Sequence, residues 1–352
     1  MASLTTALTS SSAVARKIAD YYALTKPGIL RLLVLTAFCT MLVAAGGMPD
    51  LWLTVWTIAG TVLICSSANV INMVWDRDID PLMERTKDRP IPQGRVDPQN
   101  ALVFAGVLGF AAVMILTYLV HPLAALMGIL GHLYYVGIYT MWLKRSTPHN
   151  IVIGGGAGAF PVLIGWAAVT GQLSLTAWVI FAIVFLWTPP HFWALALYKD
   201  IEYEAADVPM MPVVRGKAAT KFQMLLYTLL LLGATTLLAV VELMGIVYLV
   251  ASVLLGAGFA YCCIRTAFDK TDRWAKRTFA YSIVYLALLF GAMSVDSFQT
   301  GHFTEDRYLA GIEQEADRLR AEQDEETLRS VHNGEAEGGD RTDEAPPTPS
   351  VR

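Results

Sequence analysis

Charged residues are scarce in this chain of 352 residues. Asp, Glu, Lys and Arg together make up 16% of the sequence, and hydrophobic residues make up 55%. Soluble globular domains carry roughly 25% charged residues. The mean hydropathy of +0.48 points the same way. The shortage of charge therefore excludes an ordinary soluble domain and predicts a chain that lies largely within a membrane.

The missing charge leaves long runs without any Asp, Glu, Lys or Arg. These runs cover residues 32–49, 51–75, 98–143, 146–198, 222–241, 243–264 and 278–295. A membrane-spanning helix needs about 20 mostly apolar residues, so the third and fourth runs each hold two spans, divided at His121-Pro122 and Gly171-Gln172. We predict an all-α integral membrane fold with nine transmembrane helices, at about residues 28–46, 51–75, 100–120, 123–142, 150–170, 174–198, 222–242, 246–267 and 277–297.

Cysteine is also rare, and its positions do not suggest metal binding. Cys39, Cys65, Cys262 and Cys263 all fall within predicted spans, and none has the spacing of a metal motif. Residues 1–27 lack the apolar core of a secretory signal peptide. No stretch has the features of a nucleic-acid-binding motif.

The basic residues lie in alternate loops. Of the 26 Lys and Arg residues, six follow residue 300; the other 20 precede or open the first span or lie near 76–99, 143–149, 199–221 and 265–277. Lys and Arg concentrate on the cytoplasmic side of membrane proteins. We therefore expect a multi-pass protein of the cell (plasma) membrane with a cytoplasmic N-terminus. An odd number of spans then places the C-terminus outside the cytoplasm.

Two terminal segments are expected to lie outside the membrane domain. Residues 1–20 are rich in Ser, Thr and Ala, and we predict a disordered arm. Residues 301–352 are rich in Asp and Glu and poor in apolar groups, a composition typical of disorder, so we predict a disordered acidic tail. The membrane domain is then expected over residues 21–300.

Polar residues recur at regular spacing where the second predicted span ends. Asn72, Asp76 and Asp80 are spaced i, i+4 and i+8, so on a continuous helix they share one face, with Asn69 on the same side. Pro81 favours an end to that helix. Polar groups at membrane depth usually face the interior and mark function. We interpret this cluster as the working site.

Carboxylates beside basic residues suit a metal-bound diphosphate. Mg²⁺ takes one or two carboxylates and fills its other positions with water and substrate phosphates. Basic side chains nearby can contact phosphate oxygens; the candidates are Arg77, Arg85, Lys87, Arg89 and Arg95. The alternative is a solvated helix end that carries ordinary positive-inside charge. It would explain the basic residues, but not Asn72 and Asp76, which lie within or at the edge of the apolar run.

A second acidic cluster follows the sixth predicted span. Asp200, Glu202 and Glu204 lie there, with basic residues around them at Lys199, Arg215 and Lys217. Two even-numbered spans thus bring the same feature to the same side, which suggests two related halves around a central cavity. Spacing alone does not decide which of the three acids takes part.

His191 and Trp193 are the remaining candidates. His191 follows Pro189-Pro190 about two turns inside the sixth span, where broken backbone hydrogen bonds are tolerated if they line a cavity. The side chain is either a packed, hydrogen-bonded core histidine or a functional contact. Trp193 lies on the same stretch.

Several blocks resemble the membrane-embedded aromatic prenyltransferases. The motif N-x-x-x-D-x-x-x-D at 72–80 is typical of that superfamily. The blocks D-R-D-I-D-P-L-M-E-R-T-K-D-R-P-I-P-Q-G-R (76–95), T-P-H-N-I-V-I-G-G-G-A-G-A-F-P-V-L-I-G-W (147–166), T-P-P-H-F-W-A-L-A (188–196) and V-P-M-M-P-V-V-R-G (208–216) are closest to its haem-modifying branch, the protohaem IX farnesyltransferases or haem O synthases. The resemblance runs from about Tyr21 to Gln299.

The resemblance implies an activity and its substrates. It implies nine helices around a cavity, farnesyl diphosphate as donor with Mg²⁺ as cofactor, and haem b as acceptor. A vinyl group of haem b would be farnesylated to give haem O for terminal oxidases. Haem A synthase and terminal oxidase assembly factors are then candidate partners, beside membrane lipid.

The family's residue roles carry over only where the motifs match. Catalytic candidates are Asn72, Asp76, Asp80 and Glu202, and metal candidates are Asp76, Asp80, Asp200 and Glu204. Diphosphate-binding candidates are Arg77, Arg89, Lys199 and Arg215, and haem-side candidates are His191 and Trp193. The second motif departs from the usual D-x-x-x-D by reading D-x-E-x-E at 200–204, so its metal ligand stays open.

Two alternatives compete with this interpretation. One is a prenyltransferase that acts on a quinone precursor. The other is a transporter with paired acidic sites. Both acidic clusters are predicted on the cytoplasmic side, which argues against a transporter, because transport sites tend towards the midplane of the membrane.

Overall fold

A computed structural model describes residues 14–241, 243–300, 316–320 and 323. The chain divides into two compact units, Met1–Phe303 and Thr304–Arg352. In the second unit only 316–320 and 323 are described, and they are helical. The rest of the expected acidic tail, residues 301–352, lies outside the described residues.

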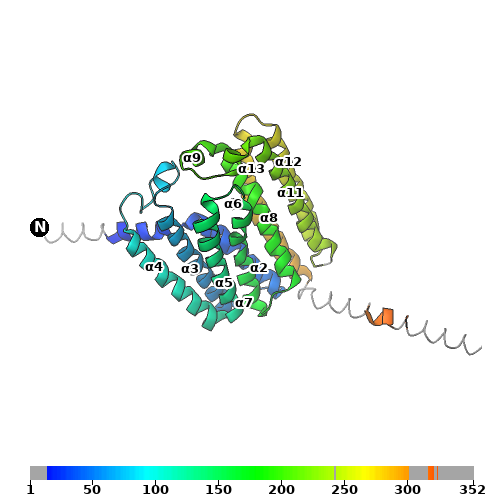
Figure 1. Ribbon diagram of the computed structural model, residues 1–352. Helices are drawn as coiled ribbons and strands as arrows, with labels where there is room; N and C mark the ends of the chain where they lie inside the picture. The colour runs from blue at the N-terminus through cyan, green and yellow to red at the C-terminus, as the bar shows by residue number, and fades with distance from the viewer. Residues whose placement is uncertain (1–13, 242, 301–315, 321–322, 324–352) are drawn as a thin grey trace, which may run out of the picture. The chain divides into compact units, whose positions relative to one another are not determined.

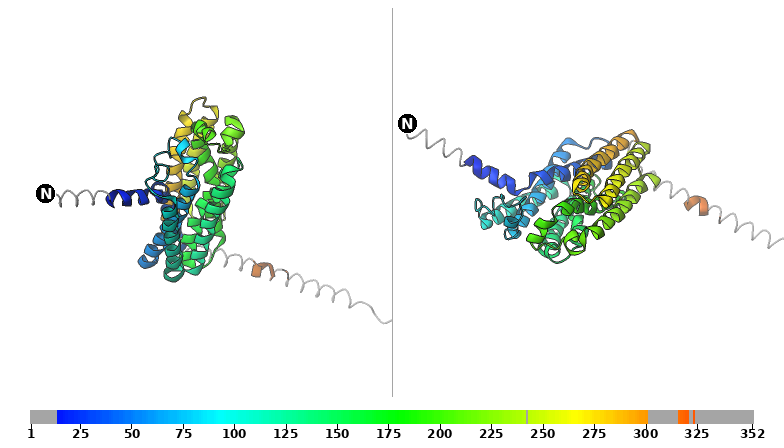
Figure 2. Two further views of the ribbon diagram at one scale, coloured as in Figure 1. Left: turned by 60° about the vertical axis from the view of Figure 1, so that its left-hand side comes forward. Right: turned by 90° about the horizontal axis from the view of Figure 1, so that it is seen from above.

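The first unit is a bundle of long helices, and the described residues contain nine that are long and apolar enough to cross a membrane. Figures 1 and 2 show them side by side, with α4 and α12 at opposite edges. In chain order they are α2 (Pro27–Ala45), α3 (Leu51–Trp75), α4 (Pro98–Ile115) with η2 (Leu116–Val120), α5 (Pro122–Leu133) with η3 (Tyr134–Trp142) and η4 (Leu143–Arg145), α6 (Asn150–Gly154) with η5 (Gly155–Ala159) and α7 (Phe160–Thr170), α8 (Leu175–Tyr198), α11 (Gly216–Val240), α12 (Ile246–Phe268) and α13 (Arg273–Thr300). The predicted all-helical fold with nine spans is confirmed.

Two of these helices begin several residues earlier than predicted. α11 was expected from 222 and begins at Gly216, and α13 was expected from 277 and begins at Arg273. A charge-free run marks the part of a helix that suits the hydrocarbon core, whereas the helix itself continues into the interface, where charged side chains are solvated.

Side chains at the helix starts explain several of the boundaries. Asp50 accepts a hydrogen bond from the Leu53 amide at 2.8 Å, and Asp97 caps α4 in the same way. Ser174 accepts from the Ala177 amide at 3.3 Å. These side-chain oxygens accept hydrogen bonds from backbone amides that have no partner within the helix.

Asp296 is a buried carboxylate within α13, and it caps the preceding helix. Its oxygens accept hydrogen bonds from the amides of Gly245 at 2.5 Å and Tyr248 at 3.2 Å, at the start of α12. An ionisable side chain inside a span usually suggests function, but here it completes the backbone hydrogen bonding of a neighbouring helix.

A glycine brings two spans into close contact. A Cβ atom on Gly165 of α7 would lie 2.5 Å from the carbonyl oxygen of Ala37 in α2. Small residues at such crossings let backbones approach closely in membrane bundles. A Cβ on Gly158 would meet nothing within 4 Å.

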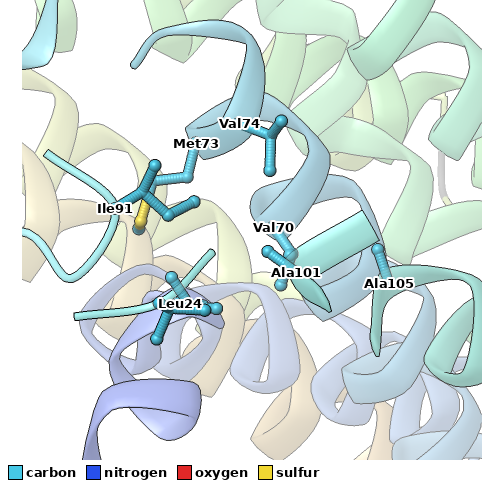
Figure 3. Close-up of a cluster of buried hydrophobic side chains, with 8 residues drawn as sticks. Leu24, Val70, Met73, Val74, Ile91, Ala101 and Ala105 are labelled. Carbon is cyan, nitrogen blue, oxygen red and sulfur yellow. The ribbon is translucent and has the colours of Figure 1, made fainter. Parts of the chain in front are cut away.

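The segment before α2 is ordered where it is described. Residues 14–24 are helical, so the expectation of a disordered arm over 1–20 is wrong for 14–20, while 1–13 lie outside the described residues. Leu24 is fully buried against α3 and α4 (Figure 3). It packs with Val70, Met73 and Ala101, and this apolar contact fixes the segment.

The loops that follow α3 and α8 meet at one end of the bundle (Figure 1). The first contains η1 (Asp80–Leu82), and the second contains α9 (Asp200–Ala205) and α10 (Met211–Val214). Ile79 and Met83 of the first loop share a buried cluster with Tyr203 and Val208 of the second. The fold therefore joins the two segments that carry the acidic motifs.

Candidate active site

Asp76 lies directly after the last residue of α3 and is 1% exposed. Its amide donates to the Asn72 carbonyl at 2.9 Å, which ends the helix. Lys144 Nζ lies 2.5 Å from Asp76 Oδ2, and Arg145 Nη2 lies 3.8 Å from Oδ1. Oδ1 is buried and has no hydrogen-bond partner within the described residues. This oxygen is available to a ligand.

Asp80 lies beyond the end of α3, in η1. The expected continuous helix through Asn72, Asp76 and Asp80 is wrong in this detail, because α3 ends at Trp75. The Asp80 amide still donates to the Asp76 carbonyl at 2.9 Å. One helix-like turn therefore connects the two aspartates. Arg89 Nη1 lies 2.9 and 2.7 Å from the two oxygens of the buried Asp80 carboxylate.

Asn72 connects the site to two other segments. Its Oδ1 accepts a hydrogen bond from Lys26 Nζ at 2.5 Å, and its Nδ2 donates to Thr140 Oγ1 at 3.0 Å. Asn69 Nδ2 donates to the Thr25 carbonyl at 3.0 Å. Both amides of the predicted polar face therefore hold the residues that lead into α2.

Lys26 is a partly buried lysine that interacts with the residues of this cluster. Its backbone adopts the left-handed conformation, with φ 56°, which is uncommon for a side chain with a Cβ. Burial lowers the pKa of Lys26 well below its usual value, and repulsion from Arg89 lowers it further, against the attraction of Asp76. An anion that binds beside such a lysine stabilises its charged form.

The charges of the cluster favour an anionic ligand. Lys26 interacts electrostatically with Asp76, Asp80, Arg89 and Lys144. With Lys26 protonated, three cations face two carboxylates. The excess positive charge, in a place where water is largely excluded, suits a phosphate group.

The residues of the second cluster are more exposed. Glu202 pairs with Lys199, and Lys217 Nζ lies 2.9 Å from Asp200 Oδ2. Glu204 is exposed. Because α8 ends at Tyr198 and α9 starts anew at Asp200, Glu202 is not in helical register with the span above it.

Two predicted phosphate contacts lie outside the buried cluster. Arg77 is exposed, and its Nη1 donates to the Val74 carbonyl at 3.3 Å. Arg215 is exposed just before α11. Arg85, by contrast, interacts with Tyr203 across the two loops: burial raises the pKa of Tyr203, and the charge of Arg85 lowers it.

The predicted metal ligands are not gathered in one place. Among the described residues, no group of three or more His, Cys, Asp or Glu side chains is arranged to hold a metal ion. Asp76, Asp80 and Asp200 each pair with a basic side chain. The Oδ1 of Asp76, which has no hydrogen-bond partner among the described residues, nevertheless provides one hard oxygen of the kind that Mg²⁺ prefers.

His191 and Trp193 are packed side chains. The His191 ring stacks between Trp187, 4.3 Å away, and Phe279, 4.6 Å away, and its Nδ1 lies 2.6 Å from Ser282 Oγ. Trp193 is fully buried. His191 thus has the surroundings of a packed, hydrogen-bonded core histidine, the first of the two interpretations given above.

Sequence reasoning missed three side chains of this cluster. Lys26, Thr140 and Lys144 come from the segment before α2 and from the end of the fourth span. In the sequence alone, the two lysines indicate only the topology. Their position within about one turn of a span end was the available signal, because a cation there can reach inward as well as towards lipid headgroups.

A family model for the UbiA prenyltransferase family matches residues 33–293. The chain belongs to the UbiA prenyltransferase family. A protohaem IX farnesyltransferase of Symbiobacterium thermophilum is 52% identical over 281 residues, which cover 79% of this chain and 94% of the relative. One from Nostoc sp. is 49% identical, over 81% of this chain and 90% of the relative. One from Roseiflexus sp. is 48% identical, and the match spans only 52% of that longer relative.

Solved structures of two other proteins share the fold. A digeranylgeranylglyceryl phosphate synthase has a TM-score of 0.68 at 16% identity, over 81% of this chain and 99% of the other. A UbiA homologue from Archaeoglobus fulgidus bound to GPP and Mg²⁺ has a TM-score of 0.59 at 13% identity, over 78% and 99%. At these identities the likeness concerns the fold. The chain is a multi-pass membrane prenyltransferase.

Proposed function

We propose that this prenyltransferase transfers the farnesyl group of farnesyl diphosphate to a vinyl group of haem b, giving haem O and diphosphate. The relatives that are about half identical over most of their length are protohaem IX farnesyltransferases. The buried cluster of cations and carboxylates at the end of α3 is the observation that carries the proposal, because a diphosphate leaving group needs such surroundings.

The diphosphate is bound by cations that are now paired with carboxylates. Lys144 and Arg89 hold Asp76 and Asp80 in the described structure, and Lys26 holds Asn72. On binding, these cations turn to phosphate oxygens, and the two carboxylates become available to Mg²⁺. The diphosphate also favours the charged form of Lys26.

Mg²⁺ would be held by Asp76 and Asp80, and it supplies charge neutralisation of the leaving diphosphate when bound. A third ligand comes from the loop after α8. Asp200 is partly buried and Glu204 is exposed, so we favour Asp200 and assign Glu202 to holding Lys199 near the diphosphate. The UbiA homologue bound to GPP and Mg²⁺ supports this type of site.

The chain's own residues control the reactive farnesyl group. Asp76 and Asp80 are nearly inaccessible to solvent, and exclusion of water protects an allylic cation from hydrolysis. His191 and Trp193 shape the wall on the haem side. Since aromatic rings enclose His191 on two faces, its role is to hold that wall in place.

Residues 21–300 form the prenyltransferase domain in this proposal, in the cell membrane with the N-terminus in the cytoplasm and the C-terminus outside. The site then opens towards the cytoplasm. Haem A synthase and terminal oxidase assembly factors are the partner proteins that would receive haem O.

Asp76→Ala tests the proposal, with Asp78→Ala as the matched control. Asp78 is in the same loop, but its side chain is 58% exposed and pairs with Arg145. Membranes with Asp76→Ala should lose Mg²⁺-dependent haem O formation by about a hundredfold or more, measured by chromatography of extracted haems. Asp78→Ala should stay within about threefold of wild type. Near-normal activity of Asp76→Ala would remove the metal role.

The acceptor is tested separately. Membranes that contain the chain are given farnesyl diphosphate with either haem b or an aromatic acid that serves as a quinone precursor. Consumption of the aromatic acid without haem O formation would favour the quinone alternative.

A further inference from the structure

A cavity of about 360 Å³ lies where α12 ends and α13 begins, lined by Arg265, Phe268, Asp269 and Trp274. It belongs to the same end of the bundle as the active-site loops, because Lys217 Nζ lies 2.9 Å from Asp200 Oδ2 in the loop after α8 and 3.9 Å from Asp272 Oδ1 beside the cavity. Cavities of this volume are in the usual range for small ligands.

Two arginines lie against the Trp274 ring: Arg265, which lines the cavity, and Arg277, which lies outside the cavity lining. The guanidinium carbon of Arg265 lies 4.7 Å from the Trp274 ring centre, and that of Arg277 lies 4.8 Å from it. Arg265 also lies 5.9 Å from the Tyr261 ring. Cation–π contacts fix guanidinium groups while their N–H donors stay free for an anion.

These arginines differ from the basic residues of the active site in what they contact. Arg89 and Lys144 pair with buried carboxylates, whereas neither Arg265 nor Arg277 has a carboxylate within ion-pair distance among the described residues. The nearby Asp269 is already used: its oxygens accept from Thr271 and from the Trp274 amide. The arginine donors are therefore available.

The surroundings combine this charge with exposed apolar surface. Phe268 is 84% exposed, and Ile264 and Tyr261 are exposed on the same helix end. Three further basic residues, Lys270, Arg273 and Lys276, lie between the two arginines in sequence. Aromatic rings beside basic residues at a span end are typical of the membrane interface.

We propose that this cavity binds the phosphate headgroup of an anionic phospholipid. Arg265 and Arg277 donate to the phosphate oxygens, Trp274 holds both guanidinium groups, and the exposed side chains of Phe268 and Ile264 contact the upper acyl chain. A free phosphate compound shares the charge but gains nothing from the apolar contact, which is why we favour the lipid. The proposal is independent of the activity proposed above.

The test compares two double variants with the same net charge. Arg265→Gln/Arg277→Gln removes the stacked pair, and Lys270→Gln/Arg273→Gln removes two charges of the same loop that do not stack on Trp274. The full chain in detergent is titrated with phosphatidylglycerol or phosphatidylcholine, and bound lipid is measured by native mass spectrometry.

A defined site predicts unequal losses. Each basic residue near a membrane surface contributes about fivefold to anionic lipid binding, so diffuse attraction weakens both variants equally. We expect the Arg265/Arg277 variant to bind phosphatidylglycerol about tenfold more weakly than the Lys270/Arg273 variant, and Trp274→Leu, with its charges intact, to lose about fivefold. Equal losses in the two double variants would overturn the proposal.

Two further measurements keep the result decisive. If the glutamine variant does not fold, Arg265→Lys/Arg277→Lys keeps the charge and removes the planar stacking; wild-type lipid affinity in that variant also overturns the proposal. Glycerol 3-phosphate is the probe for a free anion. Binding as tight as that of phosphatidylglycerol would show a phosphate site without a lipid, and much weaker binding supports the lipid.

Discussion

Replacement of Lys144 by methionine tests the central ion pair of the site. Lys144 Nζ lies 2.5 Å from Asp76 Oδ2, and the two side chains are 15% and 1% exposed. Removal of one partner from a buried ion pair costs about 3–5 kcal/mol, because the remaining charge stays buried. Arg145, 3.8 Å from the other oxygen, offsets part of that cost. We therefore expect a loss of about 3 kcal/mol in the free energy of unfolding.

A second substitution separates the ion pair from simple packing. Asp76→Asn in the Lys144→Met background removes the uncompensated charge, so the double variant should recover part of the loss. The coupling free energy between the two positions should lie at about 1–3 kcal/mol. The assay is denaturant unfolding of the full chain in micelles, for wild type, both single variants and the double variant. Additivity within about 0.5 kcal/mol would refute the reasoning.

Three other outcomes are expected. Lys26→Met should raise the free energy of unfolding at neutral pH and lower activity. The stability rises because the pKa of Lys26 is depressed in the folded chain, so the charged lysine destabilises the folded state at neutral pH. This gain in stability should shrink as pH rises towards 10.5, above which the lysine is neutral in both the folded and the unfolded state. Gly165→Ala should cost about 1–3 kcal/mol and Gly158→Ala much less, since only the first Cβ meets backbone, as unfolding midpoints would show. The two hydrogen bonds from the Arg145 guanidinium lower the pKa of Asp78 to about 2. Asp78→Asn should therefore be less stable than wild type above pH 4, by at most about 1 kcal/mol because Asp78 is largely exposed. The free energies of unfolding of the two proteins should converge as pH falls towards 2.

The spans could be predicted from the sequence because each must be apolar along its length. The ends at residues 51–75 and 150–170 were predicted as the structure has them. Charge, by contrast, misplaced the starts of α11 and α13, since a helix does not stop where the hydrocarbon core does. The ordered segment before α2 was missed because its order depends on the contact of Leu24 with α3 and α4, which no local pattern reveals.

The acids of the site and Arg89, the partner of Asp80, could be predicted, whereas the lysines that bind Asn72 and Asp76 could not. Asn72, Asp76 and Asp80 stand out because polar residues at regular spacing are rare in a span. Lys26 and Lys144 lie 46 and 68 residues from the groups that they bind, and a lysine at a span end has the same appearance whether it faces lipid headgroups or the interior. Only the packing of the helices distinguishes the two.

The cap that Asp296 provides for α12 has a consequence for biosynthesis. The amides at the start of α12 donate to a carboxylate that lies 48 to 51 residues later in the chain. The start of α12 therefore cannot complete its hydrogen bonds in the bilayer until most of α13 has left the ribosome. The last two spans should therefore enter the membrane together as a hairpin. Chains that end shortly before Asp296 should leave α12 poorly inserted and open to degradation.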